Sequence, residues 1–185
     1  METLSDSEHK SERLAAMKQG VGYLEYRSLL DGFVSFIQEA VGDHVVSVVL
    51  YGSVARGKAR PESDIDLLII LKEASPVYWQ RLQPLIPILR QLRRHSCWKD
   101  LEAQGLFPSL SVLVLSQEEA KQNRFLYLDM IEEARILVDR GGFFQSRLHA
   151  LQLRLQELGA RKVQRDGTWY WDLKPNLKPG EVVTL

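Results

Sequence analysis

The 185 residues suffice for one domain with a hydrophobic core and are too few for two domains of ordinary size. The sequence is 45% hydrophobic and 26% charged, which excludes a fibrous or wholly disordered protein. Its 24 basic and 24 acidic residues cancel, so general binding to nucleic acid or to an anionic membrane is not expected.

The cysteine content and the apolar runs indicate the compartment. Cys97 is the single cysteine and has no partner for an internal disulfide, which fits a reducing environment. No apolar run approaches about 18 residues, and the polar residues 1–20 hold no signal-peptide core. We therefore expect a cytoplasmic protein without a membrane span.

Three elements are predicted in the first part of the chain. Apolar residues at steps of three and four predict a helix over 25–41, which Gly42 ends. The mostly β-branched run 45–51 predicts a buried strand that breaks at Gly52. A second buried strand is predicted over 65–71.

The middle of the chain predicts a helical region and a third strand. Apolar spacing over 77–92 indicates a helix, but Pro84 and Pro87 interrupt it, so one kinked helix and two shorter pieces both remain open. A strand is predicted over 110–115. Ser116 then has the character of a helix N-cap followed by acidic residues.

The last part of the chain predicts a helix over 126–135, a short strand over 136–138 and a helix over 143–158. Residues 161–164 and 169–171 indicate two strands joined by an Asp-Gly turn. One face of the aromatic strand 169–171 should pack on the core, and the other could meet a partner. Two Lys-Pro pairs then predict an extended tail.

This alternation of strands and helices predicts an α/β or α+β fold with a β-sheet covered by helices. We expect three parts: a polar segment 1–20, a domain 21–140, and a C-terminal part 141–185. The C-terminal part should comprise the helix, the β-hairpin and the tail, packed on the same unit.

Two acidic residues carry the first functional signal. Asp64 and Asp66 are two residues apart at the start of a predicted strand, so their side chains leave the same face of that strand. Like charges beside an apolar strand are costly unless a cation neutralises them, and carboxylate oxygens suit Mg²⁺.

A turn carries the second signal. Gly52-Ser53 ends a predicted strand, where backbone amides and a hydroxyl can approach a phosphate, and Arg56 follows close by. Each of these features alone is more often an ordinary turn or a solvated strand start. Together they predict a nucleoside triphosphate, with phosphates against the turn and a bridging metal on the two acids.

The combined pattern resembles the minimal nucleotidyltransferases of the DNA polymerase β superfamily, whose signature is Gly-Ser, about ten residues, then Asp-x-Asp. The sequence has Gly52-Ser53, ten residues, and Asp64-Ile65-Asp66, with similar flanking residues in 55–57 and at Ser63. The resemblance implies a nucleotidyltransferase fold with a mixed sheet, Mg²⁺, and ATP as donor. It also implies roles for six residues: metal binding and catalysis for Asp64 and Asp66, and nucleotide binding for Gly52, Ser53, Arg56 and Ser63.

One departure from that family affects catalysis. Active relatives usually add a third carboxylate from a later strand, and the strand predicted here over 110–115 has no acid; Ser111 stands at the best candidate for the vacated position. Two nearby acidic pairs could replace it, namely Asp100 with Glu102 and Glu118 with Glu119. Without a replacement, the site could bind nucleotide while activation of the acceptor is lost.

Two functions therefore remain. The first is a small nucleotidyltransferase that transfers a nucleoside monophosphate from ATP to a hydroxyl on a protein partner. By resemblance, that partner is a small helical protein of the HEPN class, and the chain is the antitoxin of a toxin-antitoxin pair. The second is a catalytically degenerate module that binds nucleotide or a partner.

Overall fold

The computed structural model describes residues 20–166, 168–178 and 180–185. The expectations for the polar segment before residue 20, for the glycine of the hairpin turn and for the second Lys-Pro proline therefore lie outside the described residues.

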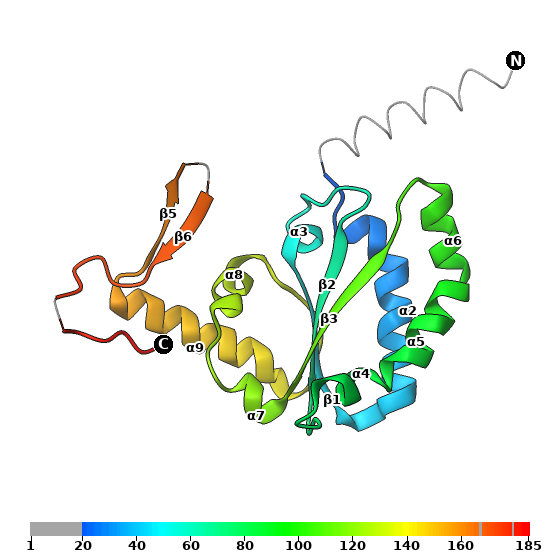
Figure 1. Ribbon diagram of the computed structural model, residues 1–185, viewed down its shortest axis with the longest axis horizontal. Coiled ribbons are helices and arrows are strands. Elements are labelled where there is room, and N and C mark those ends of the chain that lie inside the picture. Colours follow the sequence, from blue (N-terminus) through cyan, green and yellow to red (C-terminus); the bar gives the residue numbers. More distant parts are fainter. Residues whose placement is uncertain (1–19, 167, 179) are drawn as a thin grey trace, which may run out of the picture.

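The central sheet has four strands in the order β3-β2-β1-β4, and helices cover both of its faces (Figure 1). The strands are β1 (Val45–Tyr51), β2 (Asp64–Leu71), β3 (Ser109–Ser116) and β4 (Arg135–Asp139). β2 and β3 run parallel, whereas β1 is antiparallel to β2 and β4. The prediction of an α/β fold with a mixed sheet covered by helices is confirmed.

One face of the sheet packs against α2 (Tyr23–Val41), α5 (Leu85–Arg94) and α6 (Ser96–Ala103). The predicted apolar face of α2 is buried there from Tyr26 to Ile37, and Val41 at its end is partly buried. Burying a side chain such as Phe33 contributes about 1.5–3 kcal/mol, so this face fixes α2 on the sheet.

The other face packs against α7 (Gln117–Ala120), α8 (Phe125–Glu133) and α9 (Phe143–Leu158). Alternate residues of β2 belong to opposite layers: Ile65 and Leu67 pack on the α2 side, and Leu68 and Ile70 on the α8 side. Asp64 and Asp66 are in phase with Leu68. Both acids therefore lie on the face of the sheet that α8 and α9 cover.

The proline-rich region forms two helices, α4 (Tyr78–Leu82) and α5, which decides between the two forms left open by the sequence. Pro84 precedes α5, and Pro87 lies in its first turn, where the missing N–H would have no helical partner. The short helix α6 was not predicted, because only three of its residues are buried and they span little more than one turn.

The C-terminal part adds a separate hairpin of β5 (Arg161–Arg165) and β6 (Thr168–Asp172) beyond α9 (Figure 1). Trp171 packs on the core cluster of the α8 side, whereas Trp169 and Tyr170 are 57% and 47% exposed. None of the helices in the described ranges is long and apolar enough to cross a membrane.

Two short 3-10 helices connect longer elements: η1 (Gly42–His44) joins α2 to β1, and η2 (Arg140–Gly142) joins β4 to α9. α8 ends two residues earlier than predicted because Ala134 is extended and Arg135 already pairs with β1. The strand boundaries agree with the predictions to within one or two residues.

Candidate functional site

The turn after β1 brings the chain against Asp66. Gly52 opens the four-residue helix α3 (Gly52–Ala55) with a φ of +74°, a backbone conformation that side chains disfavour. A Cβ on Gly52 would also collide with the Oδ2 atom of Asp66. Glycine is therefore needed at this position both for the turn and for the close approach of the carboxylate.

The two acids of β2 project from the strand end next to this turn. Asp66 is paired with Tyr51, the last residue of β1, and is half-buried, whereas Asp64 is exposed. Because they are two residues apart in a strand, their side chains lie on one face. The structure thus places a pair of carboxylates beside Gly52 and open to solvent at one end.

The electrostatics of Asp66 favour a cation. Burial raises the pKa of the Asp66 carboxyl, and the neighbouring charge of Asp64 raises it further. A hydrogen bond from the Ser111 hydroxyl and the positive charge of Arg56 act in the opposite direction and are outweighed. The surrounding protein groups therefore do not fully stabilise the ionised form of Asp66.

β3 presents a hydroxyl where a third acid could stand. Ser111 lies opposite Asp66 in the parallel register, and its hydroxyl donates to the Asp66 carboxylate. No acidic residue occurs in β3. The position that the sequence singled out as vacated is thus directly beside the acid pair.

The replacement acids that the sequence left open lie elsewhere. Glu119 follows the far end of β3 and is bound by Arg81, at 2.7 and 2.9 Å. Glu102 accepts a hydrogen bond from Trp98 Nε1 at 2.9 Å, and α6, which carries it with Asp100, covers the opposite face of the sheet. Neither pair is placed to complete the site.

The oxygen atoms at the β2 end fit Mg²⁺. In proteins this ion is commonly held by one or two carboxylates together with substrate phosphates and water, and it does not require a closed cage of protein ligands. Asp64 and Asp66 supply two carboxylates, and Ser111 a neutral oxygen. Over the described residues, no cluster of three or more His, Cys, Asp or Glu side chains forms a metal site by itself.

The remaining predicted nucleotide-binding residues have different surroundings. Ser53 follows Gly52 in α3 and is partly exposed. Arg56 Nη1 donates to Glu133 Oε2 at 3.0 Å, so its guanidinium points towards the end of α8. Ser63 Oγ accepts from the Arg60 N–H at 2.8 Å and closes the turn that leads into β2.

α8 forms the opposite wall of the site, which was not predicted from the sequence. Asp129 and Glu133 are one helical turn apart on α8, and with Tyr51, Gly52 and Arg56 they line a cavity of about 160 Å³. Their spacing of four is the one signal that could have placed them on a common face. Which element that face meets is decided by tertiary packing.

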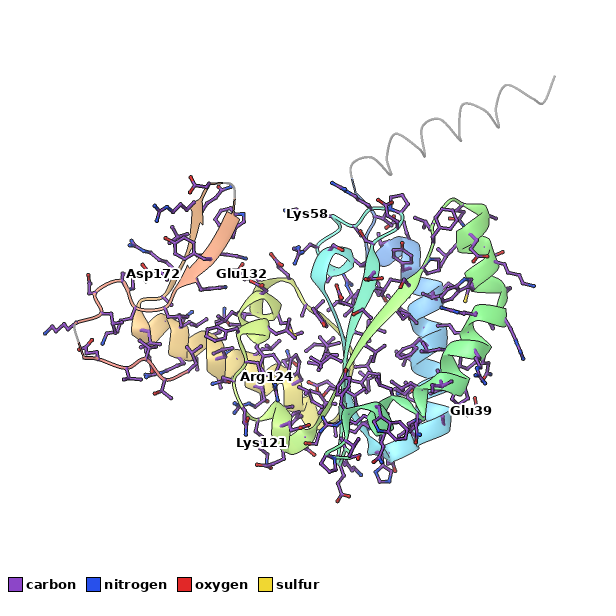
Figure 2. The ribbon with its side chains drawn as sticks, viewed as in Figure 1. Glu39, Lys58, Lys121, Arg124, Glu132 and Asp172 are labelled. Carbon is purple, nitrogen blue, oxygen red and sulfur yellow. The ribbon has the colours of Figure 1, made fainter. Side chains whose placement is uncertain are left out.

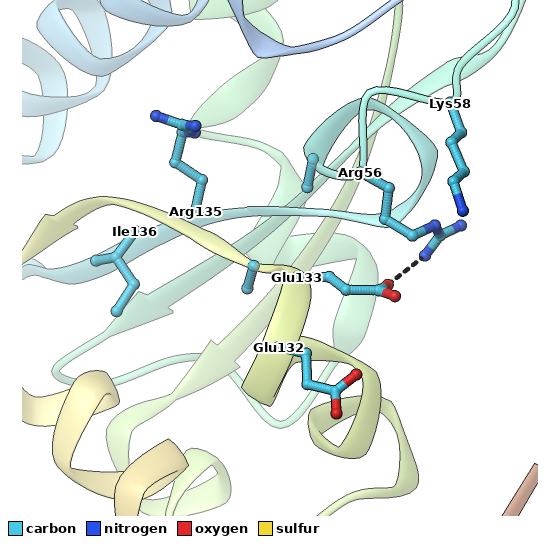
Figure 3. A pocket seen from close by; sticks show the side chains of 8 residues that line it. Arg56, Lys58, Glu132, Glu133, Arg135 and Ile136 are labelled. Carbon is cyan, nitrogen blue, oxygen red and sulfur yellow. Dashed lines mark hydrogen bonds and ion pairs between the residues drawn. The ribbon is translucent and has the colours of Figure 1, made fainter. Parts of the chain in front are cut away.

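An adjoining cavity of about 570 Å³ extends from Arg56 along the end of α8 to the start of β4 (Figure 3). Figure 3 shows Glu133 directed at Arg56, with Lys58 beside Arg56 on the same loop. The two cavities share Arg56, Glu133 and Ala134. The site therefore continues as a groove away from the acid pair.

Comparison with known proteins gives a match over the part of the chain that forms the β-sheet and the candidate site. A family described as "Nucleotidyltransferase domain" matches residues 30–138. A putative protein adenylyltransferase of Methanocaldococcus jannaschii is 22% identical over 147 residues, which are 77% of this chain and 91% of that protein.

Two solved structures are also similar. One is spectinomycin adenyltransferase AAD(9) from Enterococcus faecialis with ATP and spectinomycin, with a TM-score of 0.48, 11% identity, and coverage of 71% of this chain and 66% of that chain. The other is a toxin-antitoxin with AMP-PNP, with a TM-score of 0.39, 13% identity, and coverage of 70% and 91%.

Proposed function

The chain belongs to the nucleotidyltransferase domain family, and on this premise we propose that it transfers a nucleoside monophosphate from ATP to a hydroxyl group of a protein partner. In this proposal the chain is the antitoxin of a toxin-antitoxin pair, and its partner is a small helical protein of the HEPN class. The partner class rests on the sequence resemblance alone.

A single observation carries the proposed activity: the Asp66 carboxylate lies against Gly52 at the turn after β1, with Asp64 beside it on the same strand face. A half-buried carboxylate with a raised pKa is a liability for folding. We expect such an arrangement in a site where a bound ligand supplies the positive charge that stabilises the two carboxylates.

The residues divide into two roles in the proposed reaction. The Gly52-Ser53 turn and Arg56 would bind the phosphates, and Asp64 and Asp66 would hold Mg²⁺, which when bound would neutralise phosphate charge and orient the phosphates. The acceptor oxygen forms a bond to the α-phosphorus while the bond from that phosphorus to the bridging oxygen of the β-phosphate breaks. Pyrophosphate leaves, and the hydroxyl proton passes to water.

One relative supports the donor and the acceptor class. The relative from Methanocaldococcus jannaschii is described as a putative protein adenylyltransferase, and the match covers most of both chains. ATP as donor and a protein hydroxyl as acceptor are consistent with that description.

A second function is favoured by one observation, the serine beside Asp66. Ser111 is a neutral ligand, and no other described acid replaces a third carboxylate at the β2 end. In this alternative the chain binds nucleotide and a partner but does not transfer the nucleotide, because nothing activates the acceptor hydroxyl.

The experiment that tests the proposal uses ATP labelled at the α-phosphate, with Mg²⁺, and the purified chain with and without the protein that co-purifies with it. Label on the partner supports transfer, and loss of that label in Asp64→Asn assigns it to this site. Nucleotide binding without transfer supports the degenerate module, and absence of both contradicts the two functions together.

A designed variant separates the two functions. Ser111→Asp places an acid opposite Asp66, whereas the control Ser109→Asp places one opposite Asp64, at the exposed start of β3. If transfer is limited by the missing carboxylate, Ser111→Asp should raise the rate at least tenfold over the control. If the chain transfers label and the rate is unchanged in Ser111→Asp, the lack of a carboxylate at position 111 does not limit transfer.

A further inference from the structure

We propose that Trp169 of the C-terminal hairpin stacks on the nucleobase of the donor, at the far end of the groove that begins at Gly52. This inference rests on the proposed function. Trp169 lies outside residues 30–138, so the family match does not assign it a role.

The groove reaches the hairpin through a cavity of about 480 Å³. Its lining includes Arg56, Asp129 and Glu133, which also line the cavity at Gly52, and in addition Trp169. The three shared residues therefore lie between the phosphate-binding turn and the tryptophan. The hairpin stands beside α8 on the same side of the sheet as the acid pair (Figure 1).

Two contacts hold Trp169 in this position. Lys162 of β5 lies 3.3 Å from Glu132, which is labelled in Figure 2, and 3.5 Å from Glu133, and these contacts tie the hairpin to the end of α8. Trp171 packs on the core. Because residues opposite each other in a two-stranded ribbon share a face, Lys162 and Trp171 lie on one face, and Trp169 is on that face as well.

The chemistry changes along the groove in the order in which a nucleotide would need it. Arg56 and Lys58 supply positive charge near the turn, for phosphates. Asp129 forms no ion pair with any described residue and offers a carboxylate, the group that commonly accepts hydrogen bonds from ribose hydroxyls. Trp169, 57% exposed, ends the series with an aromatic face.

The direction of the groove assigns it to the donor. It extends from Gly52 towards α8 and β4, whereas Ser111 and β3 lie on the other side of β2. A nucleoside whose phosphates contact Gly52 would extend along the groove, which leaves the β3 side open for the acceptor hydroxyl.

The neighbouring Tyr170 provides a matched control. It is 47% exposed, lies on the opposite face of the same strand and does not line the groove. Substituting either residue by Ala removes an exposed aromatic ring from β6. The register of the hairpin and the contacts of Lys162 are left in place.

The test is calorimetric titration of the wild type, Trp169→Ala and Tyr170→Ala with Mg·ATP and, separately, with Mg·tripolyphosphate, which has no base. Stacking on an aromatic side chain contributes about 1–3 kcal/mol per base, so Trp169→Ala should weaken ATP binding about tenfold. Its affinity for tripolyphosphate should equal that of the wild type, and Tyr170→Ala should match the wild type for both ligands.

Three outcomes overturn the inference. Unchanged ATP affinity in Trp169→Ala removes Trp169 from the base site, and an equal loss of ATP and tripolyphosphate means that the substitution disturbs the groove as a whole. A wild type that binds neither ligand overturns the proposed function as well. Base-selective loss in a chain that transfers no label supports the inference and contradicts only the proposed catalysis.

Discussion

Glu119 and Asp66 are carboxylates at opposite ends of the parallel β2–β3 pair, and their surroundings differ. Glu119 accepts two hydrogen bonds from Arg81, at 2.7 and 2.9 Å, and one from the Ser116 N–H at 2.8 Å. Arg81, whose side chain is 8% exposed, and Ser116 hold the pKa of Glu119 down at about 2. Burial and the like charge of Asp64 raise the pKa of Asp66, which has a hydrogen bond from the Ser111 hydroxyl.

This difference separates a carboxylate used for folding from one available to a ligand. The Glu119 pair fixes α4 against β3 and α7, and every charge in it has a partner. Among the described residues, none forms an ion pair with Asp64 or Asp66. Removing Glu119 should therefore reduce stability, and removing either aspartate should reduce function.

The largest expected effect is on transfer. Asp64→Asn should lower the rate of labelled-nucleotide transfer at least a hundredfold, because the variant loses one of two charges that hold the metal. Its thermal unfolding midpoint should equal that of the wild type, since Asp64 is exposed. Asp31→Asn, at an exposed position of α2, serves as a control, and unaltered transfer in Asp64→Asn would contradict the comparison.

The second prediction concerns the close approach at Gly52. Gly52→Ala should weaken Mg·ATP binding more than tenfold, since the new methyl group would displace the Asp66 carboxylate. Gly57→Ala is the matched control: Gly57 also has a positive φ, of +67°, but its Cβ would meet nothing within 4 Å. Both variants share a strain of about 1–3 kcal/mol. Equal ATP affinities in the two would show that the contact with Asp66 is unimportant.

The third prediction concerns Glu119, the carboxylate that we assign to folding. Glu119→Gln should lower the free energy of unfolding by about 1–3 kcal/mol, because the mostly buried Arg81 guanidinium loses its charged partner. ATP affinity should be unchanged. Denaturant unfolding and calorimetry measure the two quantities, and an ATP affinity that falls with stability would remove the distinction between the two ends.

The smallest expected effect is the pH dependence of the difference in stability between the wild type and Glu119→Gln. The lowered pKa of Glu119 contributes stability that is complete above its ordinary value of about 4.5 and is lost as the pH falls towards about 2. The stability gap between wild type and Glu119→Gln should therefore be constant near neutral pH and narrow in acid. A gap that widens on acidification would contradict the assigned pKa shift.

The sequence was sufficient where a local pattern determines the result. The β-branched run of β1, the apolar face of α2 and the capping residue Ser116 all lie in elements close to their predicted bounds. The two motifs at the ends of β1 and β2 predicted that the Gly52-Ser53 turn and the acid pair serve one ligand, but not that Gly52 itself contacts Asp66. These features depend on residues near each other in the chain or on neighbouring strands.

The rest of the site depends on long-range packing. The spacing of Asp129 and Glu133 does not show that α8 faces the Gly52 turn. Nor does it show that Trp169 lines the adjoining cavity. Ser63 stays a prediction as a nucleotide-binding residue, and the sequence did not show that its hydroxyl accepts from the Arg60 N–H in the turn before β2. The docking of the hairpin through Lys162 is likewise a contact between segments about 30 residues apart.

The most direct test of the central claim is a calorimetric titration of wild type and Asp66→Asn with ATP, each with and without Mg²⁺, together with their thermal unfolding. The wild type should bind ATP in a Mg²⁺-dependent manner. Asp66→Asn should lose at least tenfold in that affinity while its unfolding midpoint stays equal or rises, since a carboxylate with a raised pKa is removed. Unchanged affinity, or a marked fall in the midpoint, would show that Asp66 serves the fold and not a ligand.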